Sequence, residues 1–178
     1  MLFRSLQHPV TEQVRSADEQ IELTLSALAE LKRQTVIIYP NNDAGSSTVR
    51  AKIDAYHGPW LRVERNVSRR FFSGLLRTAS AIVGNSSSGL LEAPSFALPC
   101  VNIGRRQKGR LQCANVINVE HNKTQIMEAV QRAISPQFRK SIAGIVNLNG
   151  DGHASARIVE ILAGCAIDEQ MVMKGMTY

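Results

Sequence analysis

Residues 81–89 read AIVGNSSSG, and this stretch decides the fold because a strand pattern runs directly into a turn of small residues. The apolar run at 81–83 predicts a short buried strand that ends at Gly84. A helix is expected over 87–96, with Pro94 ending or kinking it. A turn of this kind leaves backbone N–H groups unpaired beside serine hydroxyls, so it can bind an anion. Ordinary capping of the helix by Ser86 or Ser87 explains an isolated serine-rich turn about equally well.

Strand and helix patterns alternate on both sides of this stretch. Strands are expected at 35–39, 61–64, 81–83, 100–103 and 116–119, and helices at 15–33, 46–57, 69–78, 122–133 and 154–163. Short connections between such segments are typical of βαβ units, which form a parallel sheet. We therefore predict the α/β class, with a Rossmann-like parallel sheet of at least five strands and helices on both faces. In such sheets, ligands bind at the carboxyl ends of the strands.

Composition limits the kinds of partner. The 178 residues, 44% of them hydrophobic, suffice for one domain with a real core. The net charge of +6 is concentrated in arginine clusters at 62–77 and 105–110, but only 5% of the residues are aromatic. Because base-stacking side chains are scarce, a small phosphorylated ligand is favoured over nucleic acid. A solvated basic face is the simpler explanation of either cluster alone.

Other classes of protein are disfavoured by what the sequence lacks. No apolar run reaches 18 residues and the first residues do not resemble a secretory signal, so neither membrane association nor export is expected. Three well-separated cysteines argue against a disulfide framework, which favours a cytoplasmic protein. The histidines have no partners at metal-ligand spacing, so no metal site and no cofactor are expected.

Three polar segments fall where the predicted strands end: PNNDAGS at 40–46, GNSSSG at 84–89 and GRRQKGR at 104–110. Arginines of the last segment can grip a phosphate bidentately, although such a loop on its own is more often a mobile surface loop. The segment at 84–89 is not a P-loop, a dinucleotide fingerprint or a nucleophile elbow, because the required spacings are absent. A lone histidine such as His8 is usually structural or solvent-exposed.

Four motifs in order carry a family resemblance. They are HPVT at 8–11, PNNDAGS at 40–46, GNSSSG at 84–89 with Glu92 three residues further on, and GRRQKGR at 104–110. Together they resemble the C-terminal half of the UDP-N-acetylglucosamine 2-epimerase family, over almost the whole chain. The segments at 92–96 and 106–111 are similar to the bacterial hydrolysing branch. That branch releases UDP and an N-acetylmannosamine-type sugar for sialic-acid-like pathways.

The resemblance implies one half of a GT-B type fold, in which two Rossmann-like domains enclose the active site. Residues 1–165 would be the C-terminal UDP-binding domain and residues 166–178 a tail, with the N-terminal catalytic half absent. This chain alone would then turn over little substrate. The implied partners are UDP or a UDP-N-acetylhexosamine, the missing N-terminal domain and, as a further possibility, copies of the chain in a homo-oligomer. Two alternatives stay open: the UDP-sugar-binding half of a GT-B glycosyltransferase, and a non-catalytic nucleotide-binding domain.

The resemblance also implies site residues, one by one. His8 would be catalytic, in the cleft near the diphosphate or the sugar. The nucleotide would be bound by six residues: Asn41 at the nucleotide, Val67 at the uracil, Ser86 and Ser87 at phosphate oxygens, Glu92 at the ribose hydroxyls, and Arg106 at the uridine or the diphosphate.

Overall fold

The computed structural model describes residues 2–169 and 173. Its sheet has six strands, β1 (Leu2–Leu6), β2 (Gln34–Ile38), β3 (Leu61–Glu64), β4 (Ala81–Gly84), β5 (Cys100–Ile103) and β6 (Val116–Val119). The order is β3-β2-β1-β4-β5-β6, and every neighbouring pair is parallel. The expected parallel sheet of an α/β protein is therefore confirmed.

Five of the six strands were expected from the sequence. The strand that was not expected is β1, which lies in the middle of the sheet. Phe3 pairs with Thr35 of β2 on one side and with Ala81 of β4 on the other. Arg4 and Ser5 break the apolar pattern, which is why these residues do not read as a buried strand. Strand order reverses beside β1, so the carboxyl ends of β1 and β4 flank the switch point where α/β sheets bind ligands.

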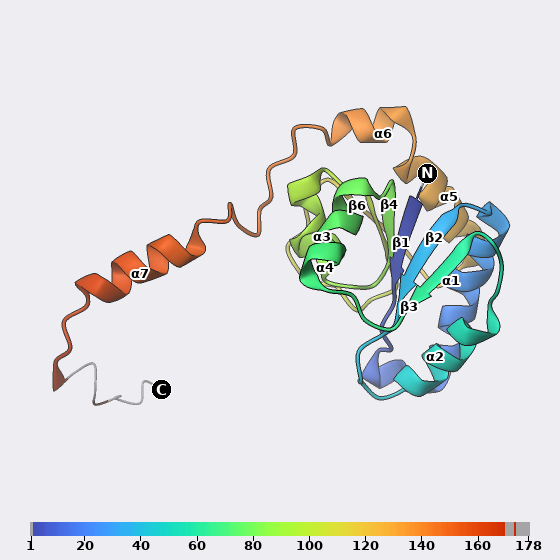
Figure 1. Ribbon diagram of the computed structural model, residues 1–178, viewed down its shortest axis with the longest axis horizontal. Coiled ribbons are helices and arrows are strands. Elements are labelled where there is room, and N and C mark those ends of the chain that lie inside the picture. Colours follow the sequence, from blue (N-terminus) through green and yellow to red (C-terminus); the bar gives the residue numbers. More distant parts are fainter. Residues whose placement is uncertain (1, 170–172, 174–178) are drawn as a thin grey trace. The chain divides into compact units, whose positions relative to one another are not determined.

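Helices cover both faces of the sheet, as expected (Figure 1). The helical elements are η1 (Thr11–Ser16), α1 (Ala17–Leu31), α2 (Ser46–Ala55), α3 (Arg69–Thr78), α4 (Ser88–Leu91), η2 (Ala93–Phe96), α5 (Lys123–Ala133), α6 (Pro136–Ser141) and α7 (Ala154–Gly164). The α1 and α5 helices pack on the face that carries Phe3 and Val83. The α3 and α4 helices pack on the other face, against Ile82 and Leu6.

The helix expected at 87–96 is interrupted near Pro94, as the proline predicted. A single α-turn, α4, ends at Leu91, and the 3₁₀ turn η2 follows with Pro94 near its start. Proline has no backbone N–H and its ring clashes with the preceding turn, so a continuous helix cannot form there. A helix of one turn has few aligned peptide dipoles, and its field on an anion is correspondingly small.

Gly84 lets β4 and β1 come together at the point where the site begins. Its φ is +134°, and a Cβ placed on it would lie 2.2 Å from the Leu6 carbonyl oxygen. No side chain fits against a backbone atom at that distance, so the position requires glycine.

The chain divides into two compact units, residues 1–147 and 148–178. Within the second unit, Asp151 forms an ion pair with Arg157 of α7. The domain boundary expected at residue 165 stays a prediction, and of the tail at 166–178 only residues 166–169 and 173 lie within the described part. Among the helices described, none has the length and apolar character needed to cross a membrane.

Candidate functional site

Asn85 joins the loops that follow β1 and β4. Its side-chain Oδ1 accepts a hydrogen bond from the backbone N–H of His8 at 2.7 Å, and its Nδ2 donates to the His8 carbonyl at 2.8 Å. The side chain is 1% exposed. These two bonds engage both ends of the amide on one residue, so they hold His8 in a fixed position at the switch point.

The loop after β2 reaches the same point through Asn41. The backbone N–H of Asn41 lies 3.1 Å from His8 Nδ1, and the Asn41 Oδ1 lies 3.0 Å from the same nitrogen. A backbone N–H can bond only an unprotonated Nδ1, whereas the amide oxygen can bond only a protonated one, so which of the two contacts is a hydrogen bond depends on the tautomer of the ring. The Asn41 Nδ2 donates to the Asp43 carboxylate at 2.5 Å, which fixes the turn between β2 and α2.

The loop after β5 closes over the same residue. Gln107 Nε2 donates to the Asn85 carbonyl at 2.7 Å, and Arg106 Nη1 lies 3.3 Å from that oxygen. Gln107 is 0% exposed, whereas Arg106 is only partly buried. One backbone carbonyl thus anchors the Gly-Arg loop, and the rest of the Arg106 guanidinium stays available to a ligand.

Electrostatics at this point favour neutral His8. Burial lowers the pKa of His8 below its ordinary value of 6.5, and the positive charge of Arg106 lowers it further, although Asn41 and Asp43 oppose the shift. Burial also lowers the pKa of Arg106, partly offset by the Asp43 carboxylate. Arg106 keeps its charge at neutral pH, because the ordinary pKa of arginine lies far above neutrality. An anion would therefore meet one arginine cation and a neutral imidazole.

The serine turn at residues 84–89 supplies hydrogen-bond donors for an anion, but fewer than the N-terminus of a long helix would. Within the turn, the backbone N–H groups of Ser88 and Gly89 already bond to Ser86, and that of Leu90 bonds to the Ser87 carbonyl. An anion here would depend on the N–H groups of Ser86 and Ser87 and on the hydroxyls. Ser86 is buried and Ser87 is partly buried.

Glu92 and Val67 lie apart from the hydrogen bonds centred on Asn85. Glu92 follows α4, and its Oε1 forms an ion pair of 2.6 Å with Nη1 of Arg69, the first residue of α3. Val67 packs against the apolar cluster around Leu6 and Leu75. The structure thus brings His8, Asn41, Arg106 and the serine turn together through Asn85, with Glu92 held by α3 instead.

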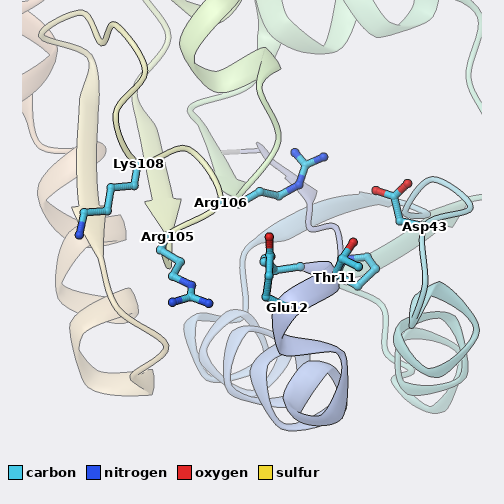
Figure 2. Close-up of a pocket in the computed structure, with 8 residues that line it drawn as sticks. Thr11, Glu12, Asp43, Arg105, Arg106 and Lys108 are labelled. Atoms are coloured by element: carbon cyan, nitrogen blue, oxygen red, sulfur yellow. The ribbon is translucent and has the colours of Figure 1, made fainter.

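A cavity of about 430 Å³ opens beside this site (Figure 2). Three loops line it: residues 9–12, Asp43, and the Gly-Arg loop with Arg105, Arg106 and Lys108. In Figure 2 the Lys108 side chain extends away from Arg106, whose guanidinium lies on the side toward Asp43. Glu12 also lines the cavity, and it was not among the residues expected from the sequence.

Sequence reasoning missed the residues that hold the site together. Asn85 and Gln107 stand inside two of the four motifs, but their role depends on loops that are distant in sequence. The available signal was an uncharged amide directly after a buried strand, where a polar side chain can bond a neighbouring loop. Among the described residues, no cluster of three or more histidine, cysteine or acidic side chains could hold a metal ion.

Several known proteins similar to this chain are named as 2-epimerases. A protein-family model described as UDP-N-acetylglucosamine 2-epimerase matches residues 2–163. A UDP-N,N'-diacetylbacillosamine 2-epimerase (hydrolyzing) from Legionella pneumophila is 32% identical over 173 residues, which are 96% of this chain and 45% of the relative. A UDP-N-acetylglucosamine 2-epimerase from Neisseria meningitidis is 33% identical over 74% of this chain and 35% of the relative. The chain thus spans less than half the length of these curated relatives.

Solved structures agree on the fold. A Neisseria meningitidis UDP-GlcNAc 2-epimerase bound to UDP-GlcNAc matches with a TM-score of 0.71 at 20% identity, over 91% of this chain and 44% of that one. A Methanocaldococcus jannaschii UDP-GlcNAc 2-epimerase in complex with UDP-GlcNAc and UDP matches with a TM-score of 0.68 at 17% identity, over 91% of this chain and 45% of that one. The expected architecture, one half of a GT-B type fold, is confirmed. The match of the family model over nearly the whole chain shows that this chain belongs to the UDP-N-acetylglucosamine 2-epimerase family.

Proposed function

We propose that this chain binds the UDP part of a UDP-N-acetylhexosamine for a hydrolysing 2-epimerase. The observation that carries the proposal is the meeting of loops from β1, β2, β4 and β5 around Asn85, at the carboxyl edge where α/β sheets take nucleotides. The names of the Legionella relative and of a Campylobacter jejuni relative, 31% identical over 79% of this chain, support the hydrolysing branch.

The proposed roles follow the positions of the side chains. Ser86 and Ser87 donate to phosphate oxygens, and Arg106 adds a guanidinium beside them. Asn41 contacts the nucleotide and orients the ring of His8, which faces the diphosphate or the sugar. The uracil lies against Val67 and its neighbouring backbone. Glu92 takes the ribose hydroxyls, which requires that its contact with Arg69 leave one carboxylate oxygen available.

This arrangement suits the first step of the proposed reaction. Loss of UDP breaks the bond between carbon 1 of the sugar and the phosphate oxygen, so negative charge grows on the leaving diphosphate. Donors and a cation already fixed at that oxygen stabilise the charge where it develops. In the proposed scheme the proton at carbon 2 is removed to give a sugar with a double bond between carbons 1 and 2, and water then adds across it, with the hydroxyl going to carbon 1 and a proton to the opposite face of carbon 2, which inverts that carbon.

Other parts of the proposal rest on the sequence alone. They are a sialic-acid-type pathway, a cytoplasmic location and assembly into a homo-oligomer. Proton transfer at carbon 2 also calls for an acid and a base within hydrogen-bond reach of the sugar. We assign those groups to a second domain that corresponds to the remaining part of the relatives.

Calorimetric titration of UDP into the purified chain tests the binding half of the proposal. Replacing both Ser86 and Ser87 with alanine should weaken UDP binding by about 1–3 kcal/mol, the range for hydrogen bonds to a charged group. Ser141→Ala on α6 is the matched control, because its hydroxyl bonds only to the Phe138 carbonyl. Absence of UDP binding to the unmodified chain would rule the function out, and an unchanged affinity in the double variant would rule out the serine placement.

UDP release from UDP-N-acetylglucosamine tests the catalytic half. We expect negligible release by the chain alone and measurable release after the N-terminal part of the Legionella relative is added. UDP binding without release in the mixture would instead favour a non-catalytic nucleotide-binding domain. Transfer of the sugar to an acceptor without epimerisation would favour a glycosyltransferase half.

A further inference from the structure

Arg4 is a charged side chain in the middle of the core. It lies on the central strand β1 and is 0% exposed. Its guanidinium carbon stands 3.8 Å from the centre of the Phe72 ring of α3, a cation–π contact. Burial lowers the pKa of Arg4 to about 10, an effect that the Glu92 carboxylate only partly offsets. The group therefore stays positively charged at neutral pH.

The folded core gives Arg4 few partners. Its one hydrogen bond runs from Nη1 to the Ser88 hydroxyl at 3.3 Å, and Nε and Nη2 have no partner among the described residues. The ion pairs of the described residues do not include Arg4, and Glu92 is paired with Arg69 instead. Burying a charge without full compensation is costly, and apolar side chains of similar volume often replace buried charges without loss of stability. Stability alone thus gives no reason for arginine here.

The single side-chain hydrogen bond of Arg4 leads to the serine turn at Ser88. Because a guanidinium only donates, the Ser88 oxygen accepts from Arg4 and its own proton is free for another acceptor. The Ser86 oxygen lies 3.0 Å away and also faces the Ser88 backbone N–H at 3.4 Å. When the Ser88 hydroxyl donates to it, the Ser86 oxygen accepts both of those contacts, and the Ser86 hydroxyl can direct its own proton to a ligand.

We propose that Arg4 is a positioning residue that, through Ser88, turns the hydroxyl of Ser86 into a donor for an anionic phosphate oxygen. The buried cation also supplies positive potential beneath the turn, where the four-residue helix α4 contributes little. This inference rests on the proposed UDP site and adds a residue that itself touches no ligand.

Arg4→Met is the direct test, because methionine fills a similar unbranched volume and keeps contact with the Phe72 ring. We expect the melting temperature to stay the same or rise. UDP affinity should fall about 10- to 100-fold, the range for hydrogen bonds to charged groups. Uridine, which has no phosphate, should bind equally well to both proteins in ligand-observed NMR. A purely structural role for Arg4 would instead change both ligands alike and lower the melting temperature.

A double-mutant cycle separates the relay from a general effect of charge. Arg4→Met and Ser86→Ala should combine to less than the sum of their effects on UDP binding, because both act through the same hydroxyl. Ser87→Ala should weaken UDP binding by the same factor in the presence and in the absence of Arg4, since Ser87 has no contact with Arg4 in the structure. Additive effects of Arg4→Met and Ser86→Ala would overturn the inference.

Ser88→Ala decides the matter if Arg4→Met does not fold. That variant leaves the buried charge and removes the link, so UDP affinity should fall while uridine binding stays unchanged. Unaltered UDP affinity in a folded Arg4→Met or Ser88→Ala variant would overturn the inference alone, because UDP binding by the unmodified chain would still support the proposed function. No UDP binding by the unmodified chain would overturn both.

Discussion

Asn85→Asp is the sharpest single change that the structure offers. Asparagine at this position accepts from the His8 N–H at 2.7 Å and donates to the His8 carbonyl at 2.8 Å. An ionised carboxylate keeps the acceptor but places a second oxygen against that carbonyl. A protonated carboxyl, in contrast, has one donor and one acceptor and can restore both bonds. The effect of the substitution should therefore depend on pH.

The expected loss of folding stability follows from the lost hydrogen bond and from the His8 carbonyl that is left unpaired. One net hydrogen bond is worth about 0.5–1.5 kcal/mol, and a buried acceptor left unpaired costs about 1–3 kcal/mol, so the variant should lose about 2–4 kcal/mol at pH 7.5. At about 1.4 kcal/mol for each pH unit, the pKa of the introduced carboxyl should rise from about 3.9 to between about 5.5 and 7. A folded-state pKa above the unfolded value means that the variant is closest to the original below about pH 4. It then loses stability as the pH rises through the folded-state pKa.

Urea denaturation of both proteins at several values between pH 4.5 and 8 measures this directly, with the unmodified chain as reference at each pH. Asn66→Asp is the matched control, because Asn66 is exposed and its Oδ1 only accepts from the next backbone N–H. The control should show no loss that grows with pH. A loss below about 0.5 kcal/mol at pH 7.5, or one that shrinks as the pH rises, would refute the role given to Asn85.

Three further predictions concern individual residues of the site. Arg106→Ala should weaken UDP binding more than Arg105→Ala or Lys108→Ala in calorimetry, because Arg106 is the one of these three cations that bonds the Asn85 carbonyl; equal losses would indicate a diffuse basic patch. The imidazole of His8 should titrate below pH 6.5 in NMR and shift upward when UDP is added, since burial and Arg106 disfavour its cation and a diphosphate would favour it. Gly84→Ala should prevent folding or lower the melting temperature steeply, whereas Gly74→Ala, whose Cβ would meet no atom within 4 Å, should be tolerated.

Local patterns were sufficient for most of the sheet and failed at its centre. The strands β2, β4 and β5 are short apolar runs buried on both faces, and period and turn residues identify them. The β1 strand carries Arg4 and Ser5, which only a neighbouring helix and loop can accommodate. A pattern confined to a few residues cannot indicate that a distant phenylalanine and serine will surround an arginine.

The candidate site, like the sheet, could be predicted from the sequence only in part. Motifs at strand ends predicted that residues from three loops would meet at one edge, because parallel strands place their carboxyl ends together, and His8 was expected there from the family resemblance alone. The hydrogen bonds of Asn85 and Gln107 could not be predicted, since each bond joins residues at least 22 positions apart. The interruption near Pro94 was predicted, but the sequence did not show that the α-helical part would end at Leu91 after a single turn.

The site is held together mainly by neutral side chains that bond to backbone groups. Two amides, Asn85 and Gln107, fix three loops through backbone N–H and carbonyl groups, and neither is accessible to solvent. Bonds of this kind are little affected by salt, so the geometry of the site stays the same when a charged ligand arrives. Among the described residues, Arg106 makes one weak hydrogen bond and can turn to the ligand, whereas Arg4 acts on the serine turn from within the core, with two guanidinium nitrogens that have no hydrogen-bond partner. A diphosphate would therefore meet donors already in place, and less of its binding energy would be needed to order the protein.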